Sequence, residues 1–242
     1  MVYNAQNELG YQFKTTREDR EVVDFDGIPL MLHLKTVTAP VKHGFSNAAK
    51  FHKARMMSRK VTVTKQTSGK LKSTIVALDL ETTGLMAGRD VIMSIGAVKR
   101  TIVGDESTFY RLIQINQPIP PKVAALTGLT TAELNSGVSL KMALADLRKF
   151  VGSAVIVGYN LRFDERFLTA AFQELGVARF TNRFEDVLPV VKDTNEFLDN
   201  YRLETVLSEY RIKNTRTHHA LSDAQATLNL AIELVKNGDL LI

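Results

Sequence analysis

The stretch Ser73–Leu85, STIVALDLETTGL, is a short apolar, β-branched run that ends in two acids. A run of this kind predicts a buried strand. Side chains alternate between the two faces of a strand, so Asp79 and Glu81 share one face while Leu80 points into the packing on the other. Two neighbouring carboxylates repel each other and raise at least one pKa unless a cation lies between them. A pair of acids at a strand end is often merely solvated, so the rest of the chain must decide its meaning.

Strands and helices alternate after this stretch. Further strands are predicted at 91–100, 106–115 and 154–160, and helices at 139–152, 164–176, 201–212 and from Ser222 to Gly238. Ser222 is the expected N-cap of the last helix. Strands flanked by helices predict an α/β fold with a mixed sheet, rather than separate all-β and all-α parts.

The composition narrows the class of protein. The chain has 242 residues, 45% hydrophobic and 24% charged, which fits a globular domain with an appendage. It has no cysteine, so any metal must be bound by carboxylate, histidine or carbonyl groups. No apolar run approaches the ~20 residues of a membrane span, and the N-terminus lacks a secretion signal. We therefore expect a cytoplasmic protein that does not enter a membrane.

The net charge of +5 is concentrated near the N-terminus. The segment from Gly27 to Leu78 contains no acid, yet holds ten Lys or Arg. This asymmetry indicates either contact with a polyanion or a solvated basic linker, and the sequence leaves both open. We assign 36–72 to a basic linker, in which 46–60 is a candidate short helix and 61–63 a candidate short strand.

Two more acids stand at predicted helix starts. Asp164 opens a helix in GYNLRFDERFL, where its charge suits the helix dipole. Asp223 lies in the first turn of the last helix, in HHALSDAQAT. Either acid alone could simply cap its helix. Four acids at element ends can form one cluster only around a positive charge, and hard oxygen ligands imply Mg²⁺ or Mn²⁺.

Three ordered motifs extend this reading: DLETTGL, GYNLRFDERFL and HHALSDAQAT. Together they resemble the DEDDh group of 3′–5′ exonucleases, the family of the proofreading subunit of bacterial replicative polymerases. The resemblance covers 73–242 and implies a ribonuclease H-like fold and a two-metal phosphodiester hydrolase. The implied ligands of two Mg²⁺ or Mn²⁺ ions are Asp79, Glu81, Asp164 and Asp223. One departure is Tyr159, where many relatives carry histidine.

The third motif of that family reads His, any residue, Ala, two residues, Asp. Only the register of His218 and Asp223 fits, because His219 would require alanine at position 221, which is Leu221. The resemblance thus implies His218 as general base, a task that suits histidine near neutral pH. It also implies residues that contact the terminal nucleotide: Thr82, Thr83, Gly84 and Leu85, with Asn160 and Phe163 in support. Core packing of Leu85 and Phe163, and a simple turn role for Asn160, are the alternatives.

A shorter resemblance covers the N-terminus. Residues 8–34, ELGYQFKTTREDREVVDFDGIPLMLHL, resemble the C-terminal end of the small type I-E CRISPR adaptation protein. They read as short strands at 9–16 and 27–34 around an acidic turn at 22–27. The resemblance implies that 1–35 is a remnant of that protein in a truncated fusion. The implied role is to trim 3′ overhangs of captured DNA before spacer insertion, with the adaptation integrase as partner.

Two other functions remain open. The motifs do not separate DNA from RNA, so the chain could be a stand-alone proofreading, repair or RNA-trimming exonuclease. A catalytically idle adaptor whose basic arm binds DNA belongs to a different class. In the enzyme hypotheses the partner is a nucleic acid with a free 3′ end, and the products are 5′-mononucleotides and a shortened strand.

Overall fold

The computed structural model describes residues 20–25, 28–33, 69–195 and 198–242. The chain divides into two compact units, Met1–Thr62 and Val63–Ile242, each described here by itself.

In the first unit, β1 (Arg20–Phe25) and β2 (Ile28–His33) form an antiparallel two-stranded sheet. The acidic turn predicted at 22–27 is wrong, because Val22 to Phe25 belong to β1 and pair with β2. The strand predicted at 9–16, the helix at 46–60 and the strand at 61–63 lie outside the described residues.

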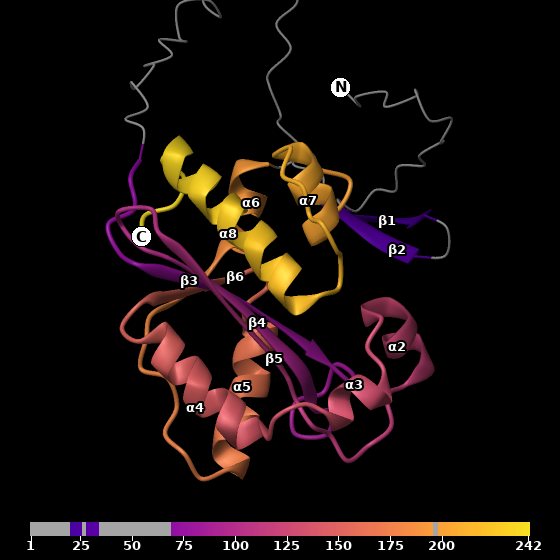
Figure 1. Ribbon diagram of the computed structural model, residues 1–242. Coiled ribbons are helices and arrows are strands. Elements are labelled where there is room, and N and C mark those ends of the chain that lie inside the picture. Colours follow the sequence, from indigo (N-terminus) through magenta and orange to yellow (C-terminus); the bar gives the residue numbers. More distant parts are fainter. Residues whose placement is uncertain (1–19, 26–27, 34–68, 196–197) are drawn as a thin grey trace, which may run out of the picture. The chain divides into compact units, whose positions relative to one another are not determined.

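The second unit contains a five-stranded sheet in the order β5-β4-β3-β6-β7 (Figure 1). Its strands are β3 (Ile75–Thr82), β4 (Ile92–Arg100), β5 (Glu106–Leu112), β6 (Val155–Gly158) and β7 (Phe184–Asp186). The pairs β3–β4 and β4–β5 are antiparallel, whereas β3–β6 and β6–β7 are parallel. The predicted mixed sheet is therefore confirmed, and only the short β7 was not predicted.

Helices cover both faces of this sheet. They are α2 (Pro121–Thr127), α3 (Thr131–Asn135), α4 (Leu140–Val151), α5 (Arg162–Glu174), α6 (Val187–Thr194), α7 (Leu203–Glu209) and α8 (Ala220–Asn237). Figure 1 shows α4 and α5 on one face, and α8 with α6 and α7 on the other. Within the described ranges, no helix combines the length and apolar character that crossing a bilayer requires.

The start of α8 differs from the sequence expectation. His219 occupies the N-cap position and the helix begins at Ala220, so the prediction of Ser222 as N-cap is wrong. The hydroxyl of Ser222 instead donates to Asn214 Oδ1 (2.7 Å) and accepts from the backbone N–H of Arg216 (3.0 Å). A hydroxyl in the first turn can serve the preceding loop as well as the helix end.

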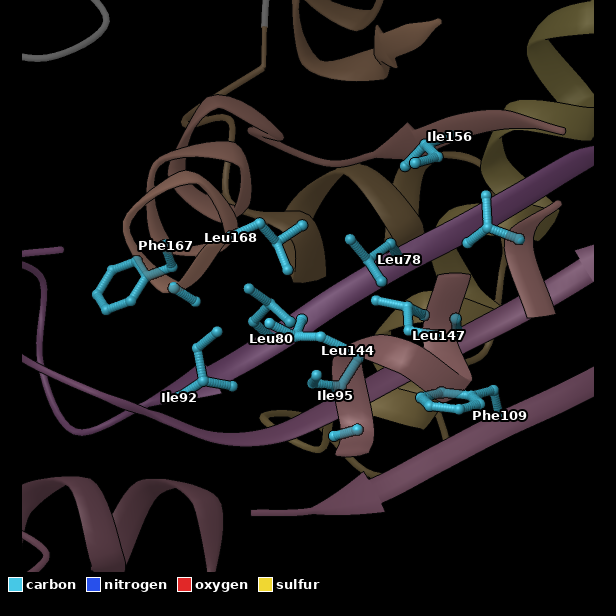
Figure 2. Close-up of a cluster of buried hydrophobic side chains, with 14 of the residues drawn as sticks. Leu78, Leu80, Ile92, Ile95, Phe109, Leu144, Leu147, Ile156, Phe167 and Leu168 are labelled. Carbon is cyan, nitrogen blue, oxygen red and sulfur yellow. The ribbon is translucent and has the colours of Figure 1, made fainter. Parts of the chain in front are cut away.

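The alternation along β3 determines which side chains face the site. Leu78 and Leu80 pack in the core between the sheet and the helices α4 and α5 (Figure 2). Ala77 belongs to the opposite core, which the side chains of α6, α7 and α8 complete. By the same alternation, the side chains of Asp79 and Glu81 point to the face of the sheet that carries Ala77. The two acids therefore lie on the face that α8 covers, as the period of two requires.

The first turn of α8 touches the sheet at Gly96 of β4. A Cβ atom at Gly96 would lie 2.1 Å from the backbone carbon of Ala220, far inside van der Waals contact. Gly96 is also the cross-strand partner of Asp79. The absence of a side chain at Gly96 thus lets the start of α8, and with it Asp223, approach the acids of β3.

The backbone before β3 packs along the C-terminus. Gly69 N–H donates to the carbonyl of Lys236 (3.2 Å), and Lys72 N–H donates to the carbonyl of Ile242 (2.7 Å). The end of the segment assigned to the basic linker thus belongs to the hydrogen-bonded structure of the second unit.

Candidate active site

The structure brings the four predicted acids together from three elements. One carboxylate oxygen each of Asp79, Glu81 and Asp223 lies within 4.8 Å of the other two. Asp164, in the first turn of α5, is only 3% exposed and is not part of this closest group. Its charge nevertheless has the largest effect of any neighbouring charge on Asp79. The end of β3 and the starts of α5 and α8 therefore form one acidic centre.

The pKa values of all four acids are raised, so it is unfavourable for the four carboxylates to be ionised together. Burial raises the pKa of Asp79, and the charges of Asp164, Glu81 and Asp223 raise it further. Burial, followed by the charge of Asp223, raises the pKa of Glu81 to about 7. Burial likewise raises the pKa of Asp164 and of Asp223. A cation would relieve this repulsion, and a ligand set made only of carboxylate oxygens suits Mg²⁺ or Mn²⁺.

Two of the acids, Asp79 and Asp223, line a cleft of about 560 Å³. His218 and Asn160 line the same cleft, and the start of α7 contributes Glu204. The cleft thus combines carboxylates that can hold a metal ion with a histidine, a combination that can activate a water for phosphodiester hydrolysis.

The two adjacent histidines occupy different environments. His218 lines the cleft with a side chain that is 41% exposed, and its Nε2 lies 3.5 Å from Glu204 Oε1. His219 stacks on Tyr110, with ring centroids 4.8 Å apart, and does not line the cleft. Of the two, only His218 lines the cleft with Asp79 and Asp223; His218 is also the histidine that the third motif favours.

Asn160 and His218 both have left-handed backbone conformations, with φ values of 56° and 55°. Such a conformation costs a residue other than glycine about 1–3 kcal/mol and must be stabilised by its surroundings. At Asn160 the support is Asp186, whose Oδ1 accepts from the N–H of Asn160 (2.9 Å) and of Leu188 (3.0 Å). Asp186 was not predicted, although an acid directly before the apolar run of α6 is a recognisable N-cap signal.

Asn214 is a second residue that the sequence did not reveal. Its side-chain amide donates to Asp223 Oδ1, and its Oδ1 accepts from Ser222 Oγ (2.7 Å). Asn214 thereby fixes the orientation of Asp223 and ties it to the segment that carries His218. It lies in a polar loop without periodicity, so no pattern distinguishes it.

The loop after β3 uses its predicted nucleotide-binding residues for its own structure. Thr82 Oγ1 donates to the carbonyl of Gly84 (2.6 Å), and Thr83 Oγ1 accepts from the N–H of Val91 (3.0 Å). Both threonines are buried. A Cβ atom at Gly84 would lie 2.5 Å from the carboxylate of Asp90, so this glycine makes room for Asp90. None of these three residues lines the cleft.

The remaining predicted contacts divide between surface and core. Leu85 is 78% exposed, which excludes the core-packing alternative for this side chain. Phe163 is half-buried and packs on Phe167 with ring centroids 4.9 Å apart, so the core alternative holds for it. Tyr159, at the position that departs from the family pattern, lines the cleft and donates from its hydroxyl to the carbonyl of Tyr201 (2.7 Å).

Comparisons of sequence relate this chain to known exonucleases and DNA polymerases. The family model described as "Exonuclease" matches residues 76–231. The chain is 32% identical over 168 residues to the PolC-type DNA polymerase III of Halalkalibacterium halodurans, and 30% identical over 170 residues to that of Bacillus subtilis. Each match covers 69% of this chain and only 12% of the relative.

Solved structures share the fold. E. coli exonuclease I in complex with a dT13 oligonucleotide matches with a TM-score of 0.60 and 20% identity, over 67% of this chain and 41% of that one. The nuclease domain of 3′hExo, a DEDDh family member bound to rAMP, matches with a TM-score of 0.62 and 16% identity, over 70% of this chain and 95% of that one. The chain belongs to the exonuclease family whose model matches residues 76–231. The acidic centre described above fits the two divalent ions, Mg²⁺ or Mn²⁺, that the resemblance to DEDDh exonucleases implies.

Proposed function

We propose that this chain removes nucleotides from the 3′ end of DNA and releases 5′-mononucleotides. The observation that carries the proposal is one acidic centre, formed by acids of β3, α5 and α8, two of which, Asp79 and Asp223, line a cleft together with His218. Membership of the exonuclease family supports the reaction class. The matched DNA polymerases and the oligonucleotide-bound neighbour support DNA as the substrate.

Each element of the cleft has a distinct part in this reaction. The residues that would hold the two ions are Asp79, Glu81, Asp164 and Asp223. When bound, the ions would acidify a water and neutralise charge on the scissile phosphate. His218, which faces the cleft, would accept the proton of the attacking water. Glu204, whose Oε1 lies 3.5 Å from His218 Nε2, would orient that ring.

The terminal nucleotide would be held by Leu85 and Asn160. The exposed side chain of Leu85 offers an apolar surface to the terminal base, a contact that tolerates any sequence. Asn160 lines the cleft and offers its amide. Thr82, Thr83 and Gly84 would act through the shape of the loop that presents Leu85. Phe163 would act through its packing on Phe167.

Digestion of 5′-labelled DNA tests the proposal. A single strand and a duplex with a 3′ overhang should both give ladders that shorten from the 3′ end in the presence of Mg²⁺ or Mn²⁺. Asp79→Asn should give no ladder, whereas the exposed control Glu174→Gln should digest like the parent. Immediate release of the 5′ label, or an unchanged ladder from Asp79→Asn, would refute the proposal. A parallel digestion of RNA decides between the two nucleic acids.

A more specific form of the proposal places this trimming in CRISPR spacer acquisition, in the cytoplasm. It is supported by the resemblance of residues 8–34 to the end of the type I-E adaptation protein, and β1 and β2 supply a two-stranded sheet in that region. We expect the full chain to trim 3′ overhangs faster when the adaptation integrase is added, and a variant lacking residues 1–35 to lose this gain. Equal rates with and without the integrase would contradict the CRISPR role and leave the exonuclease proposal intact.

A further inference from the structure

The connection between α7 and α8 separates two concave surfaces. Asn214 and His218 face the active-site cleft. Lys213 and Arg216, from the same connection, line a second pocket of about 340 Å³. Figure 1 shows this connection running from α7 to the start of α8. Neighbouring residues of this short segment therefore line both the cleft and the second pocket. A strand that leaves the cleft across this segment would reach the second pocket.

The second pocket differs from the cleft in its charge. Its polar lining is made of cations, an imidazole, hydroxyls and an amide, with these principal members: Lys213, Thr215, Arg216, His219, Ser222 and Gln225. No carboxylate is among the described residues that line it. The cleft, by contrast, contains Asp79, Glu204 and Asp223. A concave surface with two cations and several hydrogen-bond donors selects for an anion, and phosphate oxygens fit such donors well.

The two cations of the pocket are available for a ligand. Both side chains are exposed, and within the described ranges no carboxylate lies within 4.0 Å of Lys213 or Arg216. The charge of Arg216 has a small effect on the pKa of Glu133, but that carboxylate already accepts from the N–H and the hydroxyl of Thr130 (2.8 and 2.6 Å). Arg216 Nη2 lies 3.5 Å from the carbonyl of Thr127, a contact that leaves the other guanidinium donors free.

The pocket is also preformed. Ser222 Oγ lies 2.9 Å from Thr215 Oγ1 and accepts from the backbone N–H of Arg216 (3.0 Å). Ser222 also donates to Asn214, which holds Asp223. These bonds fix the backbone of the segment between the two surfaces before any ligand arrives. Binding in the pocket then has to order only the side chains of Lys213 and Arg216.

We infer that the pocket formed by Lys213, Thr215, Arg216 and Ser222 binds a backbone phosphate of the nucleic acid strand whose 3′ end occupies the cleft. The inference rests on the proposed exonuclease function and adds to it a contact away from the reacting phosphate. The pocket supplies positive charge beside the cleft, at a place where the strand can pass as it leaves the reacting centre. Contacts of this kind strengthen binding of any sequence and weaken as salt increases.

The test uses the double variant Lys213→Ala/Arg216→Ala in the full chain. A matched control, Lys141→Ala/Arg179→Ala, removes the same charges from exposed positions on α4 and on the loop after α5. Binding of a fluorescent single-stranded DNA is measured by anisotropy in Ca²⁺ over a range of KCl concentrations, and KM and kcat are measured in Mg²⁺. For the pocket variant we expect weaker binding, a higher KM with a nearly unchanged kcat, and a salt slope shallower by about 0.7 for the lost phosphate contact. A slope equal to that of the parent would overturn the inference.

A small substrate separates the pocket from the cleft. The p-nitrophenyl ester of thymidine 5′-phosphate carries only the reacting phosphate, so the pocket variant should hydrolyse it at the parent rate. Loss of this hydrolysis would overturn the inference, because the two residues would then serve the reacting centre. A change in inhibition by thymidine 5′-phosphate with an unchanged DNA salt slope would assign the pocket to the free product and overturn it as well. If the parent binds DNA with the expected slope but digests nothing, the proposed function fails while the phosphate pocket stands.

Discussion

Replacing Glu81 by Gln changes the stability of the metal-free protein in a direction that depends on pH. In the folded chain, burial and the charge of Asp223 raise the pKa of Glu81 from 4.5 to about 7. At about 1.4 kcal/mol for each pKa unit, this difference corresponds to about 3 kcal/mol. The folded state binds the proton more tightly than the unfolded chain, so the free energy of unfolding falls as the pH rises from about 4.5 to 7. Above pH 7 the full penalty applies, and below pH 4.5 it vanishes.

The measurement is thermal unfolding in EDTA at pH 5 and pH 8. Glutamine at position 81 has no charge to bury, so at pH 8 Glu81→Gln should exceed the parent in stability by up to about 3 kcal/mol, or about 6–12 °C in Tm for a domain of this size. At pH 5 the difference should fall below about 1 kcal/mol. Added Mg²⁺ should reverse the order at pH 8, because the parent gains stability from binding the ion and the variant loses a ligand.

A matched substitution identifies the source of the effect. Glu174→Gln, at the exposed end of α5, removes the same charge outside the acidic centre and should leave the pH dependence of Tm unchanged. If Glu81→Gln differed from the parent by the same amount at pH 5 and pH 8, repulsion within the acidic centre would not be the cause. An equal response from both variants would have the same meaning.

Three further substitutions test other parts of the site. His218→Ala should lose most turnover while Mg²⁺ still stabilises the protein, and His219→Ala should digest DNA almost normally; the opposite result in a ladder assay would show that the register is wrong. Asn214→Ala should weaken Mg²⁺ affinity by about 10–100-fold because Asp223 loses its orienting hydrogen bond, with activity recovering at high Mg²⁺; a titration of rate against Mg²⁺ identical to that of the parent would contradict this. Gly96→Ala should cost about 1–3 kcal/mol in denaturant unfolding and lower Mg²⁺ affinity, because the new Cβ pushes the start of α8 from the sheet; unchanged stability would show that α8 has room to shift.

The sequence predicted the secondary structure correctly where the spacing of nearby apolar and polar residues determines it. The alternation along β3 places Asp79 and Glu81 on one face whatever strands lie beside it. Apolar spacing also identified α4, α5, α7 and α8, with bounds that differ by a few residues at each end. The strand β7 has only three residues, Phe184–Asp186, and no apolar run, so its pairing with β6 depends on the tertiary fold.

The site residues could likewise be predicted only in part. The acids stand in motifs and could be identified. Asp186 carries an N-cap signal, but its bond to Asn160, 26 residues away, depends on the tertiary fold, and no local pattern marks Asn214. Sequence also does not distinguish a hydroxyl that meets a ligand from one that builds a loop. Thr83 shows this, because its Oγ1 is occupied by the backbone of Val91. The exposure of Leu85 likewise depends on how that loop folds back.

The contact of Gly96 with Ala220 has a consequence for ion selectivity. Main-chain atoms of strand and helix already touch there, so α8 has no space to move toward the sheet around a smaller ion. The contact therefore sets a lower limit to the backbone separation between β4 and the start of α8, and so to how closely Asp223 can approach the acids of β3. Mg²⁺ binds oxygen at about 2.0–2.1 Å and Ca²⁺ at about 2.3–2.6 Å. An ion with shorter bonds than this limit permits would have to be reached by the side chains alone, because the backbone cannot close further.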